Sequence, residues 1–273
     1  MKCFHHNDLD GWCAGAIVFH ASGKKCDMIE MDYKDRFPLE VVALGEKVVI
    51  VDFSIKPAVM KKLLERTKDI LWLDHHKTAM EYEKKYGAGI PGIRSNDYSG
   101  CELAWMVLYE GKPMPRAVEL IGDMDRWAWK FNKETSHFIE GSWLHDMRPV
   151  SVIWEALLGD DKKVLKDTIE RGQVCVWYRQ SICREYVRKY GFETEFEGYK
   201  CVALGLYMFG SLVFGSLIDE YDICLSFEFV GDEWLVGLYS KKVDVSVIAR
   251  KYGGGGHKGA AGFICNELPF RKR

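Results

Sequence analysis

The sequence lacks the features that identify several large classes of protein. It has no excess charge of one sign, because 38 basic residues stand against 40 acidic ones and the formal net charge is -2. Proteins that coat long nucleic acid need many Lys and Arg side chains to neutralise phosphates, so this balance argues against a long duplex as partner. Short nucleic acids and small phosphorylated compounds remain possible substrates, since binding them needs only a local positive site.

Paired cysteines and long apolar runs are also missing. The nine cysteines are scattered and odd in number, and none forms a Cys-x-x-Cys pair, which argues against a disulfide framework and a thiolate zinc site. The longest apolar runs, such as residues 14–19, fall far short of the ~18 residues of a membrane helix. The first residues run directly into polar ones, unlike a signal peptide. We therefore expect a soluble, cytoplasmic protein with buried thiols and no membrane association.

What the sequence does contain is ample material for a folded core. Hydrophobic residues make up 48% of the 273 residues, which suffices for one large domain or two modest ones. Short apolar runs alternate with amphipathic stretches in the first half, as in βαβ units around a parallel sheet. The predicted fold class is α/β with two domains. A larger domain with a mainly parallel sheet flanked by helices occupies residues 1–150, a helical connector occupies 151–195, and a smaller α/β domain with a mixed sheet occupies 196–273.

The hydrophobic pattern also predicts the individual elements. In the first region we expect strands at 2–4, 28–31, 48–51 and 70–73, and helices at 11–21, from Pro57 onwards, at 100–109 and at 116–121. The charged periodic stretch 160–190 predicts one long helix. In the last region we expect strands at 200–207, 221–230 and 233–240, and helices at 211–218 and 245–252, followed by a glycine tract.

Metal-ligand residue types follow three of these strands. The first strand runs into His6, Asp8 and Asp10, the second into Asp52, and the third into Asp74, His75 and His76. Ligands of open α/β sheets bind beyond the carboxyl ends of the strands. Side chains alternate along an extended segment, so His6, Asp8 and Asp10 point the same way, whereas His5 points the other way and is not expected to be a ligand.

So many carboxylates repel one another unless cations lie among them. Aspartate and histidine ligands without cysteine suit two divalent ions, Mn²⁺ first and Mg²⁺ next, with Zn²⁺ or Fe²⁺ as further alternatives. A carboxylate shared by ions ~3.5–4 Å apart forms a clamp for phosphoryl displacement, and Asp52 is our candidate bridge. Taken singly, each motif has a plainer interpretation: Asp8 or Asp10 as a helix cap, Asp52 as a turn residue, and the histidines as exposed loop residues. Taken together, they favour the metal site.

These motifs, His6-Asn7-Asp8-Leu9-Asp10-Gly11, Val51-Asp52-Phe53-Ser54 and Asp74-His75-His76, resemble those of the DHH phosphoesterase superfamily. Its members include nanoRNases (oligoribonucleases), bisphosphonucleotide phosphatases, cyclic-dinucleotide phosphodiesterases and single-strand exonucleases. The resemblance implies that His6, Asp8 and Asp52 hold one ion, and that Asp10, Asp52, His75 and a further aspartate hold the other. It implies that His76 contacts the substrate phosphate and that Asp74 supports it.

The further aspartate lies in the segment Ile121-Gly122-Asp123-Met124-Asp125. We prefer Asp123, because it follows the Ile-Gly pair as in relatives, and keep Asp125 as the alternative. The aromatic and basic residues after it have two interpretations, a strip on which bases stack or packing at a domain interface. That strip consists of Arg126, Trp127, Trp129, Lys130 and Phe131.

A second motif near the end of the chain, residues 253–262, resembles the glycine-rich motif of the substrate-binding domain that accompanies DHH domains. Its glycines would let backbone N–H groups approach a phosphate or ribose, and His257 would donate to a terminal phosphate. The candidate substrate-binding residues are Gly254, Gly255, Gly256, His257 and Lys258. One departure puts the exact substrate in doubt, since Lys241 stands near the place where many nanoRNase-like relatives carry an arginine.

The predicted function is hydrolysis of short oligonucleotides or small nucleotide phosphates by water activated at two metal ions. Two alternatives stay open. One is a pyrophosphatase or polyphosphatase with the same metal cluster, and the other is a nucleotide sensor without catalytic activity. The sequence does not decide between a monomer and a homodimer.

Overall fold

The chain forms two compact units, Met1–Val176 and Trp177–Arg273. The computed structural model describes residues 1–86 and 89–272. Within these ranges every helix is too short or too polar to span a lipid bilayer.

The first unit is built on a four-stranded sheet. Every neighbouring pair of its strands is parallel, in the order β2-β1-β3-β4. The strands are β1 (Lys2–His6), β2 (Asp27–Met31), β3 (Val48–Val51) and β4 (Ile70–Leu73). The predicted parallel sheet is confirmed. Because all strands run the same way, the residues that follow β1, β3 and β4 emerge at one edge of the sheet.

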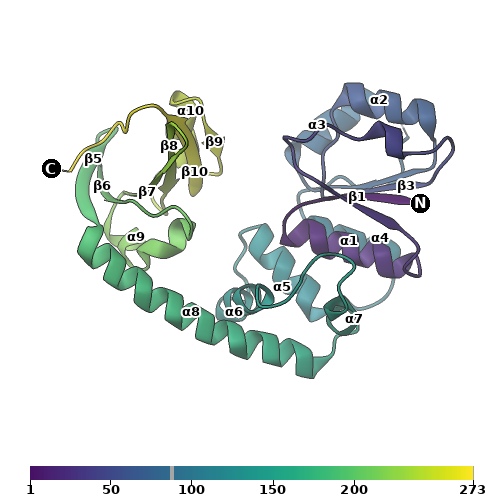
Figure 1. The fold of residues 1–273 in the computed structure, drawn as a ribbon, viewed down its shortest axis with the longest axis horizontal. Coiled ribbons are helices and arrows are strands. Elements are labelled where there is room, and N and C mark those ends of the chain that lie inside the picture. Colours follow the sequence, from purple (N-terminus) through teal and green to yellow (C-terminus); the bar gives the residue numbers. More distant parts are fainter. Residues whose placement is uncertain (87–88, 273) are drawn as a thin grey trace. The chain divides into compact units, whose positions relative to one another are not determined.

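Helices cover both faces of this sheet (Figure 1). Cys3, Val49 and Val51 pack against one layer, whereas Phe4 and Ile50 face the other. The first layer contains α1 (Leu9–Ala21), α4 (Gly100–Leu108) and α5 (Arg116–Asp125), with α6 (Lys133–Ser142) and α7 (Ile153–Leu158) beside them. The second contains α2 (Pro57–Arg66) and α3 (Lys77–Tyr86), and a short 3₁₀ turn spans Leu39–Val41. The four unbroken β-branched residues of β3 are buried because helices lie on both sides of it.

A long helix, α8 (Lys162–Tyr190), continues from the first unit into the second. Its 29 residues agree with the helix predicted at 160–190. Gly191 follows its last residue, where the sequence predicted the helix to stop.

The second unit contains a six-stranded mixed sheet, as predicted. Its order is β5-β6-β7-β8-β10-β9, and only the β6–β7 pair is parallel among these strands. The strands are β5 (Phe192–Phe196), β6 (Tyr199–Leu204), β7 (Ile223–Val230), β8 (Glu233–Tyr239), β9 (Gly255–Gly256) and β10 (Ala260–Cys265). Helix α10 (Val245–Lys251) packs on this sheet through Val245, Ile248 and Ala249.

The helix predicted at 211–218 is wrong. The structure has a 3₁₀ turn at Gly210–Phe214 and a separate short helix, α9 (Leu217–Glu220). Gly215 lies between them at φ +53°, a left-handed conformation that a continuous right-handed helix does not contain.

Candidate metal centre

Asp8 links the start of helix α1 to the end of strand β1. Its Oδ1 accepts a hydrogen bond from Gly11 N at 2.8 Å, so Asp8 is the N-cap of α1. Its Oδ2 lies 2.8 Å from His6 Nδ1. The plainer interpretation as a helix cap is therefore correct for one carboxylate oxygen, while the other oxygen faces the histidine. A single aspartate serves both roles because its two oxygens point in different directions.

Asp10 is buried against the start of helix α4. Its Oδ2 accepts from Gly100 N at 2.6 Å, and its Oδ1 accepts from Cys101 N at 3.0 Å. These N–H groups belong to the positive end of the helix dipole, which stabilises an anion there. A Cβ atom on Gly100 would lie 2.5 Å from Cβ of Asp52, so only glycine lets α4 approach both aspartates.

Asp52 occupies the centre of the cluster. It is 1% exposed, and among the described residues neither of its carboxylate oxygens has a hydrogen-bond partner. Oδ1 lies 3.1 Å from His75 Nε2, and Oδ2 lies 3.9 Å from His6 Nδ1. Its backbone has φ +52°, a conformation that costs about 1–3 kcal/mol in a residue other than glycine. Burial, strain and oxygens without hydrogen bonds at one residue indicate a functional position.

Asp125, at the end of α5, joins the cluster. Its Oδ2 lies 3.5 Å from His75 Nε2, which is also 3.9 Å from Asp10 Oδ2. This oxygen of Asp125 is buried and has no hydrogen-bond partner within the described part of the chain. The structure thus brings Asp125 to the position that the sequence analysis gave to Asp123.

Asp123 points elsewhere, so the preference for it is corrected. Its carboxylate accepts from Lys130 N at 2.7 Å and Phe131 N at 3.2 Å, and Thr135 Oγ1 also donates to it. These three donors hold the loop between α5 and α6. With both oxygens engaged inside the protein, Asp123 has a structural position and is not in the cluster.

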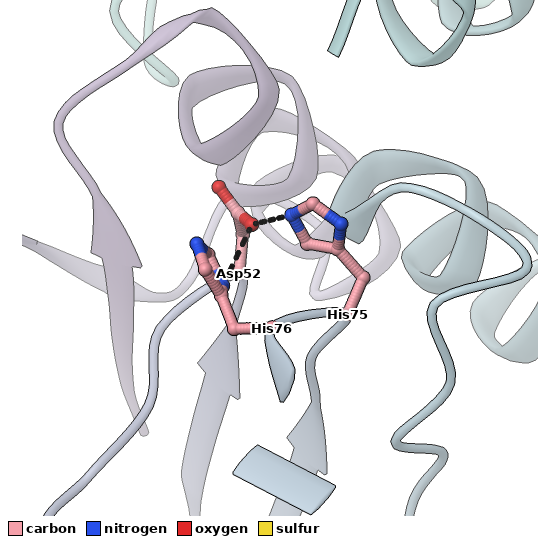
Figure 2. Close-up of side chains that lie close together, drawn as sticks. All are labelled: Asp52, His75 and His76. Atoms are coloured by element: carbon pink, nitrogen blue, oxygen red, sulfur yellow. Dashed lines mark ion pairs between the residues drawn. The ribbon is translucent and has the colours of Figure 1, made fainter. Parts of the chain in front are cut away.

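His76 and Asp74 form a pair beside Asp52. Asp74 Oδ1 accepts from His76 N at 3.1 Å and lies 2.8 Å from His76 Nδ1, while Oδ2 accepts from Ser54 Oγ at 2.7 Å. Figure 2 shows the carboxylate of Asp52 next to both imidazoles, with His76 Nδ1 at 3.8 Å. Burial lowers the pKa of His76, but the hydrogen bond to Asp74 and the nearby carboxylates outweigh it and raise the pKa overall.

The carboxylates of the cluster repel one another. Burial raises the pKa of Asp52 well above its usual value, and the charges of Asp10 and Asp8 raise it further. Burial, followed by the same two charges, raises the pKa of Asp125 to about 9. Burial lowers the pKa of His75, which favours the neutral imidazole that binds metals. A divalent cation would remove this repulsion, so the donor set fits metal ions.

The potential ligand atoms form overlapping groups whose members all lie within 4.8 Å of one another. Asp52 and His75 each belong to two of the three groups, so these two residues connect them. The groups are His6, Asp8 and Asp52; Asp10, His75 and Asp125; and Asp52, His75 and His76.

Tyr33 is a neighbour of the cluster that the sequence analysis missed. Its ring stacks on Phe53 at 4.8 Å and meets the rings of His6 and His76 at 5.2 and 5.7 Å. Ser54 N donates to its hydroxyl at 3.2 Å. Tyr33 follows strand β2, as the ligands follow their own strands, but a lone tyrosine carries no motif.

His5, as expected, points away from the cluster. It is buried beside Gly15 of helix α1.

The glycine-rich motif lies in the second unit and has tight backbone contacts of its own. Gly255 and Gly256 pair with Gly262 and Ala261 of β10. A Cβ atom on Gly254 would lie 2.0 Å from the carbonyl oxygen of Gly262, whereas one on Gly255 would meet nothing within 4 Å. The remaining candidates, His257 and Lys258, are exposed in a turn in which His257 N donates to Ala260 O at 2.8 Å.

Comparison with known sequences identifies the first unit. Residues 3–123 match the model of the DHH family, N-terminal domain. The uncharacterized protein R106 of Acanthamoeba polyphaga mimivirus is 26% identical over 243 residues, covering 84% of this chain and 56% of that protein. The chain therefore spans about half the length of the curated relative that it matches.

Solved structures share the fold at low sequence identity. The DHH domain of a member of the s1p family of ribosomal proteins has a TM-score of 0.60 at 15% identity, covering 97% of this chain and 82% of that one. The pGpG-specific phosphodiesterase PggH of Vibrio cholerae has a TM-score of 0.51 at 14% identity, covering 97% and 92%. RecJ of Thermus thermophilus, in complex with Mn²⁺, has a TM-score of 0.50 at 18% identity, covering 97% and 49%. Residues 3–123 of this chain thus match the DHH family, N-terminal domain, and the chain shares its fold with solved structures that include a DHH domain.

Proposed function

We propose that this chain hydrolyses short oligonucleotides or small nucleotide phosphates with two divalent metal ions, Mn²⁺ in the first place. One ion would be held by His6, Asp8 and Asp52, and the other by Asp10, Asp52, His75 and Asp125. Ions held there would act as Lewis acids that activate water and neutralise charge on the phosphoryl oxygens. In this proposal residues 1–150 form the catalytic domain, 151–195 the connector and 196–273 the substrate-binding domain.

The observation that carries the proposal is the position of Asp52. Its two oxygens face different partners, Oδ1 towards His75 at 3.1 Å and Oδ2 towards His6 at 3.9 Å. A carboxylate that is buried without hydrogen bonds destabilises a protein unless a cation compensates it. An aspartate with one oxygen towards each ligand group has the placement of a bridge between two ions.

His76 and Asp74 supply the second part of the chemistry. Asp74 lies 2.8 Å from His76 Nδ1 and orients the ring. In the protonated ring, which the raised pKa of His76 favours, Nε2 would donate to a phosphate oxygen of the substrate. In the second unit, backbone N–H groups of Gly254, Gly255 and Gly256 would hold the other end of the substrate, with His257 and Lys258 as donors.

The known relatives support the metal and the substrate class. RecJ of Thermus thermophilus is described in complex with Mn²⁺, and PggH is described as specific for pGpG, a dinucleotide. A dinucleotide agrees with the nearly balanced charge of this chain, because a short substrate needs only a local positive site. The free thiols throughout the chain support a cytoplasmic location, since such thiols persist in reducing compartments.

The test is a substrate panel with Mn²⁺, in which products are separated by chromatography. The panel contains dinucleotides such as pApA, longer RNA, single-stranded DNA, cyclic dinucleotides and pyrophosphate. We expect mononucleotides from the dinucleotides, no product when a chelator is added, and no product from the Asp52→Asn variant. Faster hydrolysis of pyrophosphate than of any nucleotide would favour the pyrophosphatase alternative. Nucleotide binding without turnover under any divalent metal would favour the sensor.

A further inference from the structure

An exposed tryptophan closely follows one of the proposed metal ligands along the chain. Trp127 is 57% exposed and follows Asp125 by two residues, in the loop between α5 and α6. Consecutive Cα atoms are ~3.8 Å apart, so the Cα atoms of Trp127 and Asp125 are separated by at most ~7.6 Å. The indole is therefore attached within one nucleotide's reach of the proposed metal ligands.

The loop holds this tryptophan in a defined position. Trp127 has φ +56°, and its backbone N–H donates to Met124 O at 2.9 Å. The next residue is held by Asp123, whose carbonyl oxygen accepts from Ala128 N at 2.9 Å. Two backbone donors further along the loop and the hydroxyl of Thr135 in α6 bind the carboxylate of Asp123. These hydrogen bonds fix the loop although the backbone of Trp127 is strained. As a result, the large apolar side chain of Trp127 stays exposed to solvent and is not buried in the core.

The other members of the aromatic strip are already engaged. Phe131 lies under the guanidinium of Arg116 at 3.6 Å, and Arg126 binds Glu102 through Nε at 2.9 Å. Trp129 is partly buried and meets the ring of Trp127 edge-on, with centroids 5.2 Å apart and an angle of 80°. An edge-on neighbour supports the indole of Trp127 while leaving ring surface for another aromatic group.

We propose that Trp127 is a specificity-determining residue on which a base of the substrate stacks while the adjoining phosphate lies at the metal centre. This inference rests on the proposed function and deepens it. It makes a nucleobase part of what the enzyme recognises, so a phosphate compound without a base is a poor substrate. Every base has a π-face, so stacking selects nucleotides without selecting a sequence.

The experiment compares pApA with an analogue in which hydrogen replaces one base. Losing one base–aromatic stack corresponds to a roughly 5- to 100-fold weaker interaction. We expect Trp127→Ala to raise KM for pApA by that factor with little change in kcat, and to leave KM for the abasic analogue unchanged. Trp127→Phe should restore most of the affinity, whereas Trp127→Leu, which keeps bulk without a π-face, should not. Trp143→Ala removes an equally exposed indole outside the loop and is the matched control.

Binding measurements keep this inference separate from the proposed function. In the Asp52→Asn background, which is not expected to turn over, the dissociation constant of pApA is measured by calorimetry with and without Trp127→Ala. A roughly 5- to 100-fold weakening there supports stacking even if the wild-type protein hydrolyses nothing. Hydrolysis by the wild type combined with less than a twofold effect of Trp127→Ala overturns stacking and leaves the proposed function intact. Equal losses for pApA and the abasic analogue, or no binding of pApA at all, also overturn it.

Discussion

The two candidate motifs of this chain lie in different units and differ in what their local structure explains. In the metal centre, the fold leaves both oxygens of Asp52 and the Oδ2 atom of Asp125 buried without hydrogen bonds in the described structure, and it holds Asp52 in a strained conformation. In the glycine-rich motif, close backbone contacts account for Gly254 and Gly256 without any ligand. A strained, buried carboxylate destabilises the fold and therefore indicates a functional role. A glycine that close backbone packing requires is explained by the fold and gives no such indication.

Gly255 is the exception within the glycine-rich motif. A side chain at this position would meet nothing within 4 Å, so packing does not explain why a glycine stands there. A substrate that approaches the backbone closely at this position would require a glycine there, and packing alone would not. Substitutions at both motifs therefore test the difference between them.

The largest effect is expected from Asp52→Asn. This change keeps the shape of the side chain and removes the charge that would bridge two ions. Substitution of residues that only support metal ligands lowers affinity or activity about 10- to 100-fold, so loss of the bridge should exceed ~100-fold. Hydrolysis of pApA with Mn²⁺ measures it, and Asp27→Asn, at an exposed carboxylate outside the cluster, is the control. Without metal the same variant should melt at a higher temperature, because a buried carboxylate without hydrogen bonds, close to other carboxylates, is gone. Activity near the wild-type level would contradict the metal centre.

The second effect separates Asp123 from Asp125. Asp123→Ala leaves three donors of the α5–α6 loop without an acceptor, which should destabilise the protein by about 3 kcal/mol or more. Asp125→Ala removes an oxygen that accepts no hydrogen bond, so stability without metal should stay the same or rise. Chemical denaturation measures stability, and calorimetric Mn²⁺ titration should show weaker binding for Asp125→Ala alone. If Asp123→Ala loses metal affinity while its stability is unchanged, the sequence preference was right.

The sequence predicted the framework of the first unit because its physical signals are strong there. Val48–Val51 is an unbroken β-branched run, which a strand covered on both faces requires. Once these strands are parallel, their carboxyl ends meet at one edge, and His6, Asp52 and His75 come together as a consequence. The topology does not say which of these residues bind metal and which contact substrate, and the resemblance to the family motifs supplied those expected roles.

The remaining features depended on tertiary contacts. The sequence analysis did not predict helices α3 and α6, whose residues are mostly polar and offer few apolar side chains to mark a buried face. Residues two apart on a helix face different directions, so Asp123 and Asp125 had to differ in role, but the sequence did not say which one faced the cluster. Strand β9 consists of two glycines and exists only because β10 lies beside it.

A smaller effect is expected at Gly254. A methyl group there would lie 2.0 Å from the carbonyl oxygen of Gly262, and backbone does not move as easily as the end of a side chain. Gly254→Ala should therefore destabilise the second unit by about 1–3 kcal/mol, the usual range for overpacking. Chemical denaturation followed by amide exchange in β9 and β10 would locate the loss. Unchanged stability would mean that the strand pair is looser than described, and the structural account of this glycine would fail.

Gly255→Ala is expected to have the smallest effect on stability, and it tests the glycine-rich motif most directly. Open space around the added methyl group keeps the change in unfolding free energy within about 0.5 kcal/mol. If backbone N–H groups of this strand hold the substrate, the methyl group crowds the ligand instead, and a loss of about 1 kcal/mol raises KM for pApA roughly fivefold with kcat unchanged. A stable Gly255→Ala protein with the wild-type KM would mean that this glycine has no role in binding, so a substrate contact would have to come from the exposed His257 and Lys258.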